Sequence, residues 1–364
     1  EMTVVRNEFE SGENNPFGVL RQRVSATAYL WHAYGRSVIG SRSDIENVPI
    51  ERLQAFYRNY YQPDNAVLIL AGKFDEANAL GMVARNFGEL RKPERELRPT
   101  YTVEPTQDGE RTVTLRRAGD VQLVSAMYHI APGAHTDYAA IDVLVALVTH
   151  VPSGRLHKSL VESGLASSTF GNEQQQHEAG FAYFGANVRQ GQPLDAARDA
   201  LIAALEGFAR SPVTEDEVAR ARTRLLNDIE LGLASSRSLA GLLSETAAMG
   251  DWRMLFLHRD RVRQVTAADV QRVATAYFKS SNRTLGMFLP TGTGTPDRAD
   301  IPSVPDVAAV LKDYRGAGPV AKGEAFDPTP GNIEARVIRR TLAGGMKLAL
   351  LPKKTRGATV VAQF

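Results

Sequence analysis

The spacing of apolar residues predicts that amphipathic helices and short strands share the front of the chain. Helical spacing predicts helices over residues 1–13, 17–30, 49–61 and 76–90. Pro16 separates the first two helices, and Asp75 is placed to cap the last one. The apolar run from Val67 to Ala71 predicts a buried strand.

The stretch from residue 110 to residue 290 is predicted to contain both strands and helices, and more of each than the front of the chain. Apolar and polar residues alternate in the predicted strand 111–117, and strands over residues 121–130, 167–176, 180–188 and 283–289 follow. Helical spacing predicts helices over residues 136–147, 154–163, 194–209, 214–249 (with a break) and 266–279. Thr214 and Glu217 have the spacing of a capping box. We therefore expect one complete α+β domain here, with helices packed on one face of a largely antiparallel sheet.

Two stretches of the chain repeat each other without a gap. Residues 48–70 align with residues 265–287 after a shift of 217 positions. The identical pairs are Val48 and Val265, Gln54 and Gln271, Tyr60 and Tyr277, Asn65 and Asn282, and Leu68 and Leu285. Each copy consists of a helix pattern, an aromatic pair, a polar turn with Asn and an apolar strand pattern. Because the period is far longer than that of a solenoid repeat, it predicts two related domains whose shared segments superpose.

The first copy has less sequence in front of it than the second. About 47 residues precede the first copy, whereas about 150 lie between residue 100 and the second copy. The chain also opens at Glu1 inside a helical pattern and closes inside an apolar strand pattern that starts at Thr359. We therefore expect this chain to be a piece of a longer protein.

Proline-rich stretches mark the predicted domain boundaries. Residues 91–107 are polar and contain three prolines, and residues 292–334 hold six of the 18 prolines in the chain. The second stretch predicts a long linker with one short helix near residues 307–313. Alternation around Gly344-Gly345 predicts a hairpin over residues 337–351. We accordingly divide the chain into a first domain (1–100), a second domain (101–291), a linker (292–334) and the first strands of a third unit (335–364).

Composition narrows the possible functions only a little. An apolar fraction of 43% and a charged fraction of 23% are ordinary for a globular protein. A net charge of +2 favours neither nucleic acid nor an anionic membrane as an obligate partner. No apolar run approaches the ~20 residues that span a bilayer. The lack of cysteine excludes disulfides, cysteine-based zinc sites and a thiol nucleophile within these residues.

The opening helix carries the first candidate for chemistry. Glu1 and Glu8 are seven residues apart, which is two helical turns, so they share one face with Val4 and Val5 on or near it. Carboxylates beside apolar residues can be partly buried, and a metal ion is one cation that would compensate their charge. The alternative is a solvated helix with scattered acidic residues.

The other candidates are weaker. None of the seven histidines has the spacing that places two metal ligands on one helix face. Ser153-Gly154-Arg155 opens a predicted helix and could bind an anion, or it is a plain turn. Neither a phosphate-binding loop nor the Gly-x-Ser-x-Gly sequence of a serine hydrolase is present.

Several motifs together resemble the M16 metallopeptidases, the family of insulinase, pitrilysin and mitochondrial processing peptidase. The motifs follow one another in the family's order over nearly the whole chain: residues 4–10, 32–40, 56–72 and 154–166. Residues 341–352 resemble the opening strand of a half-molecule in this family.

The resemblance implies a fold and a chemistry. It implies LuxS/MPP-like metallohydrolase domains, arranged as two halves of two similar α+β domains each. An inverted His-x-x-Glu-His motif in the first domain would supply two zinc ligands and a general base. By residue matching, the third zinc ligand is Glu8, and Glu1 is the carboxylate that supports it. A zinc-bound water, deprotonated by the motif glutamate, would attack a peptide carbonyl.

This chain departs from the family pattern because the His-x-x-Glu-His motif is absent from its residues. The resemblance therefore implies a parent zinc metalloendopeptidase that hydrolyses peptides or small proteins, while this piece alone is inactive. The alternative is a non-catalytic binding or assembly subunit with the same fold. The implied partners are a peptide or unfolded protein substrate and the second half of the parent chain, without nucleic acid or a membrane span. The implied location is periplasmic or secreted.

Overall fold

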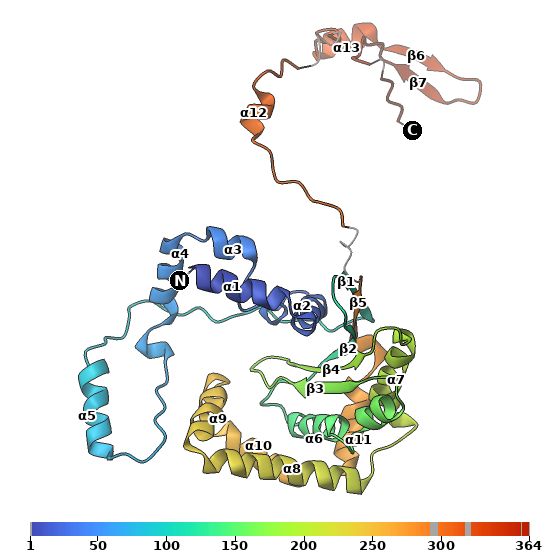
Figure 1. Cartoon of the computed structure of the whole chain (residues 1–364). Coiled ribbons are helices and arrows are strands. Elements are labelled where there is room, and N and C mark those ends of the chain that lie inside the picture. The colour runs from blue at the N-terminus through green and yellow to red at the C-terminus, as the bar shows by residue number, and fades with distance from the viewer. Residues whose placement is uncertain (1, 292–297, 317–321, 358, 364) are drawn as a thin grey trace. The chain divides into compact units, whose positions relative to one another are not determined.

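The computed structural model describes residues 2–291, 298–316, 322–357 and 359–363 (Figure 1). The chain divides into two compact units, residues 1–297 and residues 298–364. The predicted domain boundaries near residues 100, 291 and 334 stay predictions.

A five-stranded sheet forms the centre of the first unit (Figure 1). Its strands lie in the order β1 (Arg111–Arg117), β5 (Arg283–Pro290), β2 (Gln122–His129), β4 (Phe181–Val188) and β3 (Ser168–Glu173). β1 and β5 run parallel, and every other neighbouring pair is antiparallel. The predicted strands of this region and the largely antiparallel sheet are therefore confirmed.

One face of the sheet carries the main hydrophobic core. The helices that contribute to this core are α6 (Tyr138–Thr149), α7 (Leu194–Glu206), α8 (Glu215–Ala234), α10 (Met254–Gln264) and α11 (Ala267–Tyr277). α6 is buried along almost its whole length because it contacts β3 on one side and α8 and α10 on another. Apart from Asp142, its residues are almost all apolar, as expected for a helix that is buried on several sides. The α+β fold class is confirmed.

Capping residues fix several helix starts in this region. Thr214 and Glu217 form the predicted capping box at the start of α8. Thr266 and Asp269 form a second capping box at the start of α11. The remaining helical segments here are the π-helix η3 (His157–Glu162), the 3-10 helix η4 (Gly207–Ala209) and α9 (Ser236–Ala248). The break between α8 and α9 is confirmed, whereas α10 (residues 254–264) was not predicted.

The opposite face of the sheet is covered by α2 (Pro16–Ala28), a helix from the front of the chain. Leu20, Val24 and Ala28 are buried against a second core that includes Leu123, Met127, Tyr183 and Phe288. The helices within residues 110–290 lie on one face of the sheet, as expected, whereas α2 comes from the chain in front of that domain. An apolar helix face shows that a helix is buried but does not show which surface buries it.

Side chains of the sheet fix the end of α2. The Arg111 guanidinium donates hydrogen bonds to the carbonyl oxygens of Thr27 and Ala28, at 3.1 and 2.5 Å. His129 Nε2 lies 3.0 Å from the same Ala28 oxygen. These contacts satisfy carbonyl groups that a helix leaves unpaired at its carboxyl end.

The front of the chain contains more helix than predicted and one strand fewer. Its elements are α1 (Met2–Glu13), η1 (Ala33–Gly35), α3 (Arg42–Asn47), α4 (Ile50–Tyr60), η2 (Pro63–Asn65) and α5 (Glu76–Phe87). Asp75 caps α5 as predicted, and α3 was not predicted. The predicted strand 67–71 is wrong: these residues are not a strand, and Val67, Leu68 and Leu70 are exposed. A strand needs a hydrogen-bonded neighbour, and none pairs with this segment among the described residues.

The sequence repeat is visible in the secondary structure. A shift of 217 residues places α4 (Ile50–Tyr60) on α11 (Ala267–Tyr277) with both ends matched. The same shift places η2 (Pro63–Asn65) on η5 (Ser280–Asn282). The predicted helix and turn are confirmed in both copies, whereas the strand forms only in the second.

The second unit contains a hairpin of its own. β6 (Ile338–Thr341) pairs antiparallel with β7 (Lys347–Leu350), and Gly345 in the turn has a φ of +82°, as the predicted Gly-Gly turn requires. α12 (Val307–Leu311) matches the predicted short helix, whereas α13 (Pro330–Arg336) was not predicted. The strand predicted from Thr359 is absent over residues 359–363, and Phe364 lies outside the described residues.

Candidate functional site

Glu8 lies on α1, and the end of this helix is fixed to the sheet. The Arg117 guanidinium on β1 donates a hydrogen bond of 2.8 Å to the Glu13 carboxylate, the last residue of α1. Glu8 is exposed. Glu1, which was predicted to support it, lies outside the described residues.

Glu10 faces a different surface from Glu8. Its carboxylate lies 3.9 Å from the Arg6 guanidinium and 3.7 Å from that of Arg42 on α3. Two positions along an α-helix correspond to a rotation of about 200°. The two acidic residues therefore have separate surroundings, which makes Glu10 a matched control for Glu8.

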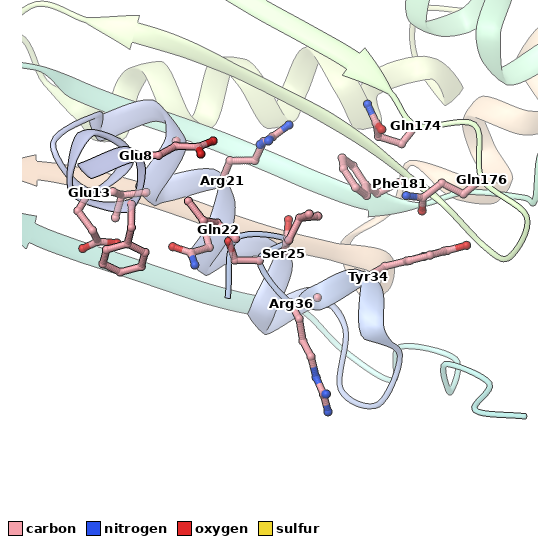
Figure 2. A pocket seen from close by; sticks show the side chains of 18 residues that line it. Glu8, Glu13, Arg21, Gln22, Ser25, Tyr34, Arg36, Gln174, Gln176 and Phe181 are labelled. Carbon is pink, nitrogen blue, oxygen red and sulfur yellow. The ribbon is translucent and has the colours of Figure 1, made fainter. Parts of the chain in front are cut away.

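A cavity of about 740 Å³ lies beside Glu8 (Figure 2). Its walls come from α1, from α2, from the segment of residues 34–39 and from the hairpin between β3 and β4. The polar and charged side chains that line it are those of Glu8, Glu13, Arg21, Gln22, Ser25, Tyr34, Arg36, Ser37, Gln174 and Gln176. Residues from the front of the chain and residues from the sheet thus line the same cavity.

Two charged side chains of the cavity are available to a ligand. Glu13 is neutralised by Arg117, whereas neither Glu8 nor Arg21 has an ion-pair partner among the described residues. Figure 2 shows the Glu8 carboxylate and the Arg21 guanidinium extending from α1 and α2 toward the β3–β4 hairpin, while Arg36 points away.

Aromatic side chains hold the two walls together. The Tyr29 hydroxyl donates a hydrogen bond of 3.1 Å to the Ala179 carbonyl, and the Tyr34 hydroxyl accepts one of 3.4 Å from the Glu178 amide. Burial raises the pKa of the Tyr29 hydroxyl well above its ordinary value, so this group stays a donor at neutral pH. The hairpin therefore has a fixed position against the segment of residues 29–34.

The hairpin wall presents glutamine side chains. Backbone hydrogen bonds fix this wall: the backbone N–H of Gln174 donates to the Phe181 carbonyl oxygen, and the backbone N–H of Gly133 donates to the Gln176 carbonyl oxygen, both at 2.8 Å. Gln176 Oε1 is buried and accepts no hydrogen bond from the described residues. An unpaired buried acceptor is costly, so a donor that reached this oxygen after a side-chain rotation would stabilise this wall.

The described residues do not form a complete metal site. No three His, Cys, Asp or Glu side chains come together there in a way that could hold a metal ion. A catalytic zinc usually has three protein ligands, and Glu8 contributes one carboxylate. Zinc therefore does not fit the described residues taken alone.

The other sequence candidates have structural roles. The Gly154 amide is already bonded to the His150 carbonyl, so the Ser153-Gly154-Arg155 segment is a plain turn. The Arg155 guanidinium forms two hydrogen bonds, of 2.9 and 2.8 Å, with the Glu217 carboxylate. His258 Nε2 lies 2.7 Å from the Asp142 carboxylate and links α10 to α6.

A family model described as the M16 peptidase inactive domain matches residues 47–225. The chain belongs to the M16 peptidase family. No helix in the described residues has both the length and the apolar character needed to cross a membrane.

Relatives of known name agree with this assignment to the M16 family. The zinc protease PqqE of Helicobacter pylori is 28% identical over 281 residues, which are 76% of this chain and 63% of that protein. The chain thus spans less than two thirds of this curated relative. The crystal structure of a protease from Helicobacter pylori has a TM-score of 0.75 at 28% identity and covers 79% of this chain and 71% of that one. The first half of the periplasmic protease PqqL from Escherichia coli shares the fold, with a TM-score of 0.62 at 16% identity over 79% of this chain and 65% of that one.

Sequence reasoning did not find the rest of the cavity. Glu8 was singled out from its helical spacing with Glu1 and from its position in a family motif, whereas Arg21, Gln174 and Gln176 were not considered. The run of three glutamines at 174–176, at the end of the predicted strand 167–176, was a usable signal of a polar wall. Nothing in the sequence indicated that this end of the hairpin lies beside α1 and α2.

Proposed function

We propose that this chain is part of a zinc-dependent metalloendopeptidase that hydrolyses peptides or small proteins, with Glu8 as one of its metal ligands. The observation that carries the proposal is the position of Glu8 at a cavity of about 740 Å³ in a chain of the M16 family. The other ligands and the general base would come from residues outside these 364. Because Glu8 is a single carboxylate, we expect this chain alone neither to hold zinc tightly nor to cleave peptides.

Three substitutions in the full-length protein test the assignment of Glu8. We expect Glu8→Gln to lose zinc and most peptide turnover because the substitution removes a charged ligand. Glu10→Gln should leave both unchanged, since Glu10 pairs with Arg6 and Arg42 on another surface. Glu1→Gln should fall between them, because carboxylates that support a metal ligand typically contribute roughly 10–100-fold.

Zinc content by metal analysis and peptide turnover are measured together for the three variants. The metal measurement does not depend on activity, so it separates ligand loss from a general loss of function. If Glu10→Gln loses zinc as completely as Glu8→Gln, the assignment of Glu8 is wrong.

A second candidate function is a non-catalytic binding or assembly subunit. The observation in its favour is that the matching family model describes an inactive domain and begins at residue 47, after Glu8. The parent sequence upstream of Glu8 distinguishes the two functions. A His-x-x-Glu-His motif there would support the peptidase, and its absence would support a subunit that binds peptides without cleaving them.

The remaining proposals concern partners, location and domain limits. We propose that the parent acts on peptides or unfolded proteins and that residues 335–364 begin its second half. A periplasmic or secreted location follows from the resemblance and is tested by cell fractionation. Limited proteolysis tests the proposed boundaries: cleavage should concentrate in the linker 292–334 and near residue 100, whereas residues 110–290 should resist.

A further inference from the structure

We infer that the cavity beside Glu8 binds an extended peptide segment and that Arg21 selects segments with an acidic side chain. This inference rests on the proposed function in one respect, namely that the ligand is a peptide. It adds that the peptide carries an acidic side chain and that Arg21 binds this side chain.

One basic side chain of the cavity, Arg21, is placed to pair with an acidic group of a ligand. Arg21 lines the cavity and has no ion-pair partner among the described residues. Its guanidinium and the Glu8 carboxylate extend toward the same hairpin (Figure 2). A guanidinium can bind a carboxylate through two parallel hydrogen bonds, which gives both affinity and geometric selection.

The opposite wall favours a peptide backbone. Side-chain amides both donate and accept hydrogen bonds, as peptide groups do, and Gln22, Gln174 and Gln176 line the cavity. Gln176 Oε1 is enclosed and accepts no hydrogen bond from the described residues, so a rotation of the Gln176 side chain toward the cavity breaks no hydrogen bond at this oxygen. After that rotation, a backbone N–H of a bound segment would donate to it. This observation is independent of Arg21.

The space between these walls suits a short stretch of chain. The cavity volume of about 740 Å³ lies within the usual range of ligand sites, roughly 300–1,000 Å³. Phe181 gives it an apolar surface against which a side chain could pack. The segment would thus contact Arg21 through its acidic side chain and Gln176 through its backbone.

Binding to the purified 364-residue chain tests the inference directly. Three end-blocked, fluorescein-labelled peptides of otherwise uncharged sequence carry Glu, Gln or Lys at the centre, and fluorescence anisotropy gives their dissociation constants. We expect the Glu peptide to bind about tenfold more tightly than the Gln peptide at low salt, as for one charge-assisted contact. This preference should shrink as the salt concentration rises.

Substitutions assign the preference to Arg21. Arg21→Gln should abolish the preference for Glu over Gln, and Arg21→Glu should favour the Lys peptide. Arg23→Gln is the matched control, because Arg23 is also exposed on α2 but does not line the cavity. Gln176→Met should weaken the Glu and Gln peptides by the same factor. Circular dichroism of each variant verifies that the fold is retained.

The result that would overturn the inference is equal binding of the Glu and Gln peptides, or an equal effect of Arg21→Gln and Arg23→Gln. Absence of measurable binding of any peptide would also overturn it. Failure of the proposed function has a different signature: the full-length protein would keep the Arg21-dependent preference in binding yet hold no zinc and cleave no peptide.

Discussion

The two copies of the repeat share a helix and a turn, but matching side chains are exposed in the first copy and buried in the second. Tyr61 is 65% exposed, whereas its counterpart Phe278 is 3% exposed. Leu68 is 55% exposed, and its counterpart Leu285 is 4% exposed. β5 of the second copy lies between β1 and β2, whereas the corresponding segment of the first copy pairs with no strand among the described residues. A helix completes most of its hydrogen bonds within itself, but a strand depends on neighbours, so only the helix and turn form in both copies.

The largest expected difference between the copies is the effect on stability of removing the aromatic ring at two matching positions, Phe278 and Tyr61. The Phe278 ring packs against Tyr128 and Phe184, with centroids 5.0 and 5.3 Å apart. Phe278→Ala should therefore destabilise the chain by about 3–5 kcal/mol, the usual cost of removing a core phenylalanine. Tyr61→Ala should cost less than about 0.5 kcal/mol, as for an exposed side chain. Chemical denaturation measures both, and equal losses would show that the first copy is as well packed as the second.

We expect the stability of the second copy to depend on pH, because a buried acidic pair lies beside it and no such pair lies beside the first copy among the described residues. His258 precedes that copy on α10 and bonds Asp142, which faces Glu173 and Tyr138. In the first copy, the position of His258 is occupied by Ser41. Burial, together with the Asp142 carboxylate, raises the pKa of the Glu173 carboxyl well above its ordinary value of 4.5.

The sign of this effect follows from proton binding. The folded chain keeps the Glu173 proton to higher pH than the unfolded chain does, so stability falls as the pH rises from 4.5 through the raised pKa. In Glu173→Gln, the side-chain amide can still donate a hydrogen bond to Asp142 but does not ionise. The stability of this variant should therefore decrease less as the pH rises. Denaturation midpoints at several pH values between 4 and 9 measure it. Glu178→Gln, on the same hairpin, is the control, and an identical pH profile in wild type and Glu173→Gln would contradict the prediction.

The smallest expected difference lies at the helix starts. Thr266 and Asp269 cap α11 through reciprocal hydrogen bonds, whereas Pro49 at the start of α4 makes no side-chain cap and Arg52 replaces the aspartate. Thr266→Ala should cost about 1 kcal/mol, as for other lost helix caps. Arg52→Ala should change the free energy of unfolding by less than about 0.5 kcal/mol. Thermal unfolding of the two variants measures both changes. A larger loss for Arg52→Ala than for Thr266→Ala would contradict the prediction.

Much of the fold could be predicted from local pattern. The capping box at Thr214 and the alternation in residues 111–117 act within a few residues, and both are confirmed. The strand at 67–71 was predicted from an apolar run like that of β5, but an apolar run does not specify its neighbour. α10 was missed because the predicted helical pattern ended at residue 249, next to Gly250, and no helix was predicted between there and residue 266.

The candidate site was only partly predictable, for a related reason. Glu8 belongs to a contiguous motif that a sequence comparison can match. Arg21 and Gln176 are 155 residues apart and line one cavity only because α2 crosses the sheet. Their proximity is a property of the tertiary structure, which no spacing along the chain encodes.

The packing of α2 on the sheet has a consequence for how this sequence can vary over evolutionary time. A Cβ atom at Gly286 on β5 would collide with Val24 of α2 and with the Ser125 hydroxyl. In the first copy, the matching position is Ile69, which does not lie in a strand. Positions 24 and 286 should therefore covary: a relative with a larger residue at 286 would need a smaller one at 24. Such paired changes, 262 residues apart, would indicate that α2 packs on the sheet in relatives whose structures have not been determined.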